Sequence, residues 1–255
     1  MKPEVAPHPY PDVKLNTDYF KGIVTDGIKL VTSPLHWETR DWLTAGLIGG
    51  TTVALGFLDE KVHEEIEENP SKARKDFLKV GEVVGDGGYA AAYLSLFYLT
   101  GLFRDDEELK STALLATESF LISGAFTLTL KHLIGRERPN NTTEADDFAG
   151  PFAGEGLAFP SGHTTTAFAI ATVFAKQYER HIWVPPLAYT LATMTALSRV
   201  NENVHWTSDV FFGAAIGYFT AAALHKLHSN PNVPKLMVRP MVSSARQGIA
   251  LDYRF

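Results

Sequence analysis

Residues 157–175 read LAFPSGHTTTAFAIATVFA, a largely apolar stretch that carries Pro-Ser-Gly at 160–162. Its length suits a helix and exceeds that of an ordinary strand. A helix that begins near Ser161 directs its first backbone N–H groups and the positive end of its dipole toward the preceding loop. Because such a helix start attracts negative charge, the stretch predicts a helix with an anion site at its first turn.

Five further apolar stretches of helical length lie along the chain. They cover residues 42–58, 87–103, 111–130, 182–197 and 210–224. Polar connectors separate them, such as HEEIEENPSKARKD at 63–76, whose charges predict solvated surface. Six apolar helices joined by polar segments predict an all-α fold, a six-helix bundle.

The two ends of the chain differ from this bundle. Residues 1–20 hold four prolines between positions 3 and 11, which predicts an irregular arm, and no apolar core that would mark a signal peptide follows the first positive charge. Residues 21–228 form the expected helical domain, and residues 229–255 form a carboxyl-terminal extension. The extension ends in strand-like alternation, with Ile249, Leu251, Tyr253 and Phe255 at every second position. This pattern predicts a small β-hairpin.

The composition excludes several classes of function. The 255 residues carry a formal net charge of -6 and no long basic stripe, which argues against a nucleic-acid partner. Cysteine is absent, so disulfides, thiolate metal sites and cysteine nucleophiles are excluded. The chain is long enough to bury a sizeable core, so its length is compatible with an enzyme.

Membrane insertion stays open at the level of sequence. The fifteen apolar residues 210–224 reach only about 22 Å as a helix, against roughly 30 Å of hydrocarbon. Glu118 also interrupts the stretch 111–130. We therefore expect a bundle that is soluble or only shallowly embedded in a membrane, in preference to one whose helices span the membrane.

A first candidate site segment reads KHLIGRERP at 131–139. Lys131 and Arg138 are seven residues apart, about two helical turns, so on a helix both cations would face one side. Lysine supplies a point charge and arginine a planar fork, a pair that suits an anion. Taken alone, the segment is more typical of a basic helix end that is solvated or lies near a membrane.

The second segment is FPSGHT at 159–164. Gly162 lets the backbone approach a phosphate closely, and the Ser161 hydroxyl can donate to one of its oxygens. His163 can give a proton to a leaving oxygen. The alternative is that Ser161 simply caps the helix beside an incidental histidine.

The third segment is SRVNENVHWTSD at 198–209. His205 and Asp209 are four residues apart, so on a helix the carboxylate can hold the far N–H of the imidazole and make its other nitrogen a nucleophile. Arg199 is near enough in sequence to reach the same pocket. The alternative is a surface His-Asp pair of little energetic weight.

Taken together, the three segments resemble the type 2 phosphatidic acid phosphatase family, which is related to vanadium haloperoxidases and bacterial class A acid phosphatases. The resemblance is close over residues 131–209. It implies the helical bundle of that family, a metal-independent phosphatase without cofactor, and a phosphorylated lipid or small phosphoester as substrate. It also implies either a periplasmic protein or a membrane-associated one with its active site on the extracytoplasmic side, and the oligomeric state stays undetermined.

The resemblance also implies a role for each site residue. His205 attacks phosphorus, Asp209 orients His205, and His163 protonates the leaving oxygen. The phosphate oxygens are held by Lys131, Arg138, Ser161, Gly162 and Arg199, and no residue is expected to bind a metal. Two alternatives use the same pocket: a vanadium-dependent haloperoxidase, and a non-catalytic protein that binds lipid phosphates.

Overall fold

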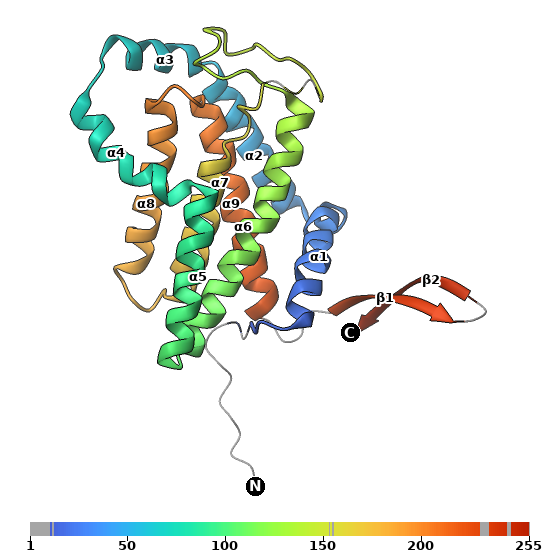
Figure 1. The fold of residues 1–255 in the computed structure, drawn as a ribbon. Coiled ribbons are helices and arrows are strands. Elements are labelled where there is room, and N and C mark those ends of the chain that lie inside the picture. Colours follow the sequence, from blue (N-terminus) through green and yellow to red (C-terminus); the bar gives the residue numbers. More distant parts are fainter. Residues whose placement is uncertain are drawn as a thin grey trace.

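The protein is described by a computed structural model that covers residues 11, 13–152, 154, 156–229, 235–243 and 246–254. Its helices are α1 (Thr17–Thr32), the 3-10 turn η1 (Ser33–His36), α2 (Thr39–Gly56), α3 (Asp59–Glu68), α4 (Lys72–Gly85), α5 (Gly87–Arg104), α6 (Glu107–Ile134), α7 (Gly162–Gln177), α8 (Val184–Asn201) and α9 (Thr207–Ser229). Figure 1 shows the long helices packed side by side, with the α6–α7 loop and α3 over one end of the bundle.

The six predicted apolar helices are confirmed as α2 and α5 to α9, and with them the all-α class. The expectation that residues 210–224 are too short for a bilayer is wrong, because α9 has 23 residues and therefore a length of about 34 Å. Two helices, α6 and α9, are long and apolar enough to cross a membrane. The pair α2 and α3, bent by 47°, would provide a third span if it crosses as one unit.

The connector at 63–76 is more ordered than its charge pattern indicates. It contributes most of α3 and the start of α4, which begins at a Ser71 cap whose side chain accepts the Arg74 N–H. Helix α4 then packs against α8, where the Thr195 hydroxyl donates to the Gly81 carbonyl at 2.7 Å. A charged connector can therefore fold into helices when one face meets the bundle.

The predicted arm of residues 1–20 ends earlier than expected. Helix α1 begins at Thr17, after an Asn16 cap that accepts the Tyr19 N–H. Just before it, the Val13 N–H donates to the Ser111 hydroxyl of α6 at 3.0 Å. Three of the four prolines lie outside the described residues.

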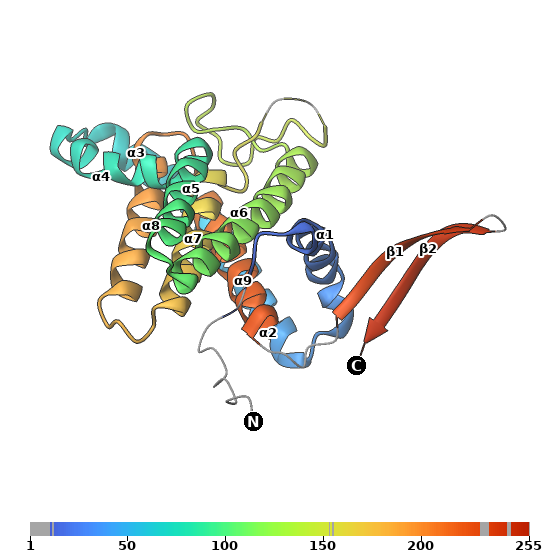
Figure 2. The ribbon, with the colours of Figure 1, turned by 60° about the horizontal axis from the view of Figure 1, so that its bottom comes forward.

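Helix α7 lies at the centre of the bundle, between α6, α8 and α9 (Figure 2). Glycines of α9 let its backbone touch that of α7. A Cβ atom on Gly213 would lie 2.6 Å from the Ser161 carbonyl oxygen, and one on Gly217 would lie 2.4 Å from the Thr165 carbonyl oxygen. This close approach fixes Ser161 at the start of α7 against the first turns of α9.

Replacing Gly217 with alanine should destabilise the protein. The added methyl group would collide with backbone atoms of α7, which cannot rotate away, and overpacking of this kind costs about 1–3 kcal/mol. The free energy of unfolding, measured by denaturant titration in detergent, checks this. Gly124→Ala in α6 is the control, because nothing lies within 4 Å of the new Cβ atom and alanine favours the helix by up to about 1 kcal/mol.

The loop between α6 and α7 closes the end of the bundle. Helix α6 stops because Gly135 takes a left-handed conformation, with φ of 63°, and its amide donates to the Lys131 carbonyl. Behind the loop, Ala145, Ala158 and Trp206 form a small apolar cluster. The cluster anchors the loop to the α8–α9 connection, which carries the third site segment.

The extension contains two antiparallel strands, β1 (Lys235–Ser243) and β2 (Arg246–Arg254), drawn in red in Figure 2. Lys235 pairs with Arg254 and Ser243 with Arg246. The strands lie where the sequence predicts a hairpin.

Candidate active site

The three site segments meet at one end of the bundle, although they come from different helices. Lys131 lies in the last turn of α6, Ser161 caps the start of α7, Arg199 lies in the last turn of α8, and Asp209 lies in the first turn of α9. A helix start that carries a cap and several cations around it is an environment for an anion.

Lys131 lies directly beside the start of α7. A Cβ atom on Gly162 would be 3.9 Å from the Lys131 Cε atom, and the lysine ammonium donates to the carbonyl oxygens of Leu157 and Ala158, the latter at 3.3 Å. Its charge is therefore held next to the backbone N–H groups of the helix start.

Ser161 caps α7, as the simpler interpretation of its segment predicts. Its fully buried hydroxyl oxygen accepts from the Thr164 N–H at 3.5 Å and from the Thr164 hydroxyl at 3.0 Å. The Ser161 N–H donates to the Asp209 carbonyl at 3.0 Å. These contacts tie the start of α7 to the start of α9.

His205 and Asp209 are in contact, but not for the predicted reason. Helix α9 begins at Thr207, so His205 precedes it and the two residues do not share a helical face. Instead the chain turns back, and the Nδ1 atom of His205 lies 3.4 Å from Oδ2 of Asp209. The same carboxylate oxygen accepts the Trp206 N–H at 2.9 Å. With its proton on Nδ1, the imidazole would keep a lone pair on Nε2.

Arg138 also reaches the site by a route that the sequence did not indicate. Helix α6 ends at Ile134, so Arg138 lies in the following loop and cannot share a helical face with Lys131. Burial is the largest cause of the lowered pKa of His163 and His205, and the positive charge of Arg138 contributes to the lowering of both. The charge of Arg138 therefore acts on imidazoles from two different segments.

Burial sets the protonation of the two histidines. The pKa of His205 is lowered to about 4 by burial first and also by the charges of Lys131 and Arg138, against the opposing hydrogen bond to Asp209. Burial is also the largest cause of the lowered pKa of His163, and the positive charge of Arg199 is the second. At neutral pH the His205 imidazole is therefore neutral and has a lone pair to donate.

Arg199 is buried among acidic residues. Its Nη2 atom lies 2.6 Å from Oε2 of Glu202 and 3.8 Å from Oε1 of Glu82. Nearby, His163 is one-third exposed, and its Nε2 atom lies 3.8 Å from Oδ2 of Asp86. Charges of both signs therefore surround His163, so its protonation will depend strongly on what binds beside it.

The structure adds two residues that the sequence did not single out. Arg136 bridges two buried carboxylates: its Nη1 atom donates to Oδ1 of Asp209 at 2.6 Å, and its Nη2 atom donates to Oδ2 of Asp59 at 2.9 Å. Asp59 in turn accepts the Ser208 N–H at 3.0 Å, at the start of α9. Arg136 therefore fixes the carboxylate that contacts His205.

Arg136 lies inside the segment KHLIGRERP, so its position in that segment was a signal that could have been followed. Asp59 offered none, because it is 77 residues away in an acidic stretch that reads as surface. In the structure its side chain is fully buried.

Comparison with known proteins points to one family. Residues 112–232 match the model of the PAP2 superfamily. A lipid A 1-phosphatase of Porphyromonas gingivalis is 42% identical over 88 residues, which are 34% of this chain and 17% of that protein. A lipid A 1-phosphatase of Rhizobium etli is 28% identical over 204 residues, 72% of this chain and 82% of that protein.

Among solved structures, a transmembrane PAP2 type phosphatidylglycerolphosphate phosphatase from Bacillus subtilis shares the fold. It superposes with a TM-score of 0.53 at 18% identity, over 82% of this chain and 94% of the other. The described helices form an all-α bundle, and the histidines and cations of the three segments gather at one of its ends. The match of residues 112–232 to the PAP2 superfamily confirms the resemblance seen in the three segments.

Proposed function

We propose that this protein is a metal-independent phosphatase that hydrolyses a phosphomonoester or diphosphate of a lipid through a phosphohistidine intermediate. One observation carries the proposal: the histidines, the carboxylate and the cations of three distant segments gather at one helix start. Phosphoryl transfer needs positioned positive charge more than covalent chemistry, and this cluster supplies it.

In the first step, the Nε2 lone pair of His205 attacks phosphorus, and the bond from phosphorus to the lipid oxygen breaks. The leaving oxygen takes a proton from His163. Although burial and Arg199 lower the pKa of His163, a bound phosphate would raise it, because a nearby anion favours the imidazolium. Lys131, Arg138 and Arg199 would hold the phosphate oxygens as they gain charge, together with Ser161 and the Gly162 N–H.

In the second step, a water molecule gives a proton to His163 and its oxygen attacks phosphorus. The phosphorus–nitrogen bond breaks, inorganic phosphate leaves, and both histidines return to their starting protonation. Asp209 stabilises the positive charge that His205 carries while it is phosphorylated, and the cations take the place of the metal ions that many phosphatases use.

A cavity beside the site supports a lipid as substrate. It has a volume of about 590 Å³, lies between α5, α7 and α8, and is lined almost entirely by apolar side chains. Ala167, in its wall, is one helical turn beyond His163, and Phe97 and Leu187 line it farther from the site. We infer that it takes an acyl chain while the phosphate lies at the start of α7. The relatives are named after phosphorylated lipids, which is consistent with such a substrate. We also propose that the active site lies on the extracytoplasmic side of a membrane.

The test is phosphate release by the purified protein from lipid and water-soluble phosphoesters, each with and without detergent and in the presence of EDTA. We expect turnover in EDTA and a preference for phosphorylated lipids. Loss of activity on chelation alone would overturn metal independence, and equal turnover of short soluble esters would overturn the lipid assignment. Oxidation of bromide in the presence of vanadate and peroxide would favour the haloperoxidase instead.

The pH dependence of kcat/KM tests the nucleophile. Because burial lowers the pKa of His205 to about 4, the imidazole keeps its lone pair down to that pH, and protonation below it blocks attack. Activity should therefore be retained on the acid side to about pH 4 and fall about tenfold per pH unit below. An acid limb near 6.5, the ordinary pKa of histidine, would contradict the assignment, provided that circular dichroism shows an intact fold at each pH.

A further inference from the structure

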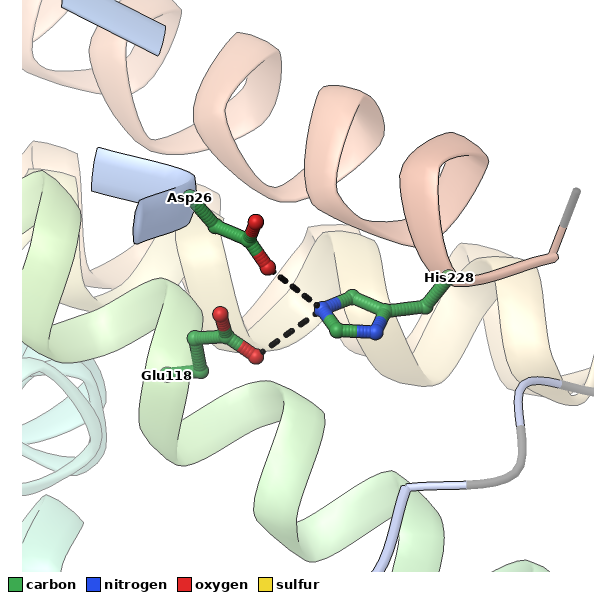
Figure 3. Close-up of side chains that lie close together, drawn as sticks. All are labelled: Asp26, Glu118 and His228. Atoms are coloured by element: carbon green, nitrogen blue, oxygen red, sulfur yellow. Dashed lines mark ion pairs between the residues drawn. The ribbon is translucent and has the colours of Figure 1, made fainter. Parts of the chain in front are cut away.

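A second cluster of polar side chains lies away from the candidate active site. Asp26 of α1, Glu118 of α6 and His228 of α9 point toward one another (Figure 3). The His228 Nε2 atom lies 3.1 Å from Oε2 of Glu118 and 3.3 Å from Oδ2 of Asp26. Three helices that are far apart in sequence thus each contribute one ligand atom.

The cluster is poorly satisfied by the protein alone. Glu118 is in the middle of the apolar helix α6 with a side chain that is 1% exposed, and within the described residues neither of its oxygens makes a hydrogen bond. One ring nitrogen, His228 Nε2, faces both carboxylates, whereas Lys29 pairs only with the other oxygen of Asp26, at 2.7 Å. A buried carboxylate whose oxygens make no hydrogen bond is costly, and an ionisable group inside an apolar helix is a candidate functional group.

The separations fit a metal ion. One nitrogen and two oxygens bound tetrahedrally at about 2.0–2.1 Å lie about 3.3–3.4 Å from one another. The two separations of 3.1 and 3.3 Å that involve His228 are close to this value. One imidazole and two carboxylates form a ligand set for a divalent transition metal such as Zn²⁺. We propose that Asp26, Glu118 and His228 bind such an ion.

The ion would have a structural task. Glu118 is 13 residues from Lys131 along α6, or about 20 Å, and His228 is 19 residues from Asp209 along α9, or about 28 Å. The metal is thus too far away to touch the phosphate. It would instead fasten α1 to α6 and α9, beside the hydrogen bond that the Tyr19 hydroxyl donates to the Leu114 carbonyl. His228, which is one-quarter exposed, offers the ion a way in.

The experiment measures metal content and stability in the full chain. The protein, stripped with EDTA and dialysed against a small excess of Zn²⁺, is analysed by mass spectrometry of metals and by thermal unfolding. We expect about one Zn²⁺ per chain and a higher melting temperature with zinc than with EDTA. Glu118→Gln, Asp26→Asn and His228→Gln should each lose the ion and the zinc-dependent shift. His225→Gln, one turn earlier on α9, should keep both and is the matched control.

Wild-type protein that binds no zinc and shows no shift would overturn the proposal, and the cluster would then be a closed set of ion pairs. Zinc retained equally by all three variants would overturn it too. Should a variant fail to fold, the wild-type titration decides by itself. None of these readouts needs phosphatase activity, so this proposal and the proposed function can fail separately. Phosphate release should continue in EDTA at temperatures below the lowered melting point.

Discussion

His205→Ala is expected to lower the turnover of a phosphorylated lipid by at least about 10³-fold. The variant loses the atom that would bond to phosphorus, and no other imidazole lies against the Asp209 carboxylate among the described contacts. Initial rates of phosphate release at saturating substrate give the loss in kcat. The fold should survive, because alanine leaves the Asp209 bonds to Trp206 and Arg136 in place.

A chemical readout makes this prediction specific to the mechanism. With a substrate labelled on phosphorus, rapid quenching should trap an acid-labile phosphoenzyme in the wild type and none in His205→Ala. His132→Ala is the matched control. The His132 imidazole lies in the last turn of α6, next to Lys131 in the sequence, and among its described hydrogen bonds it contacts only the Leu128 carbonyl, at 2.8 Å. Wild-type levels of turnover or of trapped label in His205→Ala would refute the assignment of the nucleophile.

Apolar length was sufficient to predict the six main helices, because a helix hidden by its neighbours needs little more than apolar residues over three or more turns. It was not sufficient for α3 and α4. Their charged faces match solvated surface, and contacts such as that of Gly81 with the backbone at Met194, seen in the structure alone, reveal that α4 packs on α8. A glycine in a charged stretch does not by itself indicate which helix will pack against it.

The candidate site shows the same limit. The residue types and spacing of its three segments predicted a joint pocket, and the segments do meet. Helical periodicity, however, gave the wrong reason for two pairs. Gly135 ends α6 before Arg138, and α9 starts after His205, so loops bring these residues into place. Local patterns cannot predict the path of a loop that is fixed by contacts such as Trp206 against Ala145 and Ala158.

The network of Asp59, Arg136 and Asp209 leads to the second large expected effect. Arg136→Ala would leave two fully buried carboxylates with no guanidinium between them, and breaking a buried pair in this way costs about 3–5 kcal/mol. Because Asp209 would also lose its position against His205, kcat should fall by about 10–100-fold, the usual range for a group that orients a functional side chain. Denaturant unfolding and steady-state kinetics measure the two effects.

We propose Arg136 as a positioning residue, so its loss should change kcat far more than KM, since the cations proposed to bind the phosphate stay in place. Arg136→Lys keeps the charge but not the fork that reaches both Asp59 and Asp209, and it should recover part of the stability and little of the rate. Asp59→Asn separates the two roles, because the amide oxygen can still accept the Ser208 N–H while the charge is removed. If Arg136→Ala raised KM and left kcat unchanged, Arg136 would act on the substrate and not through Asp209 and His205.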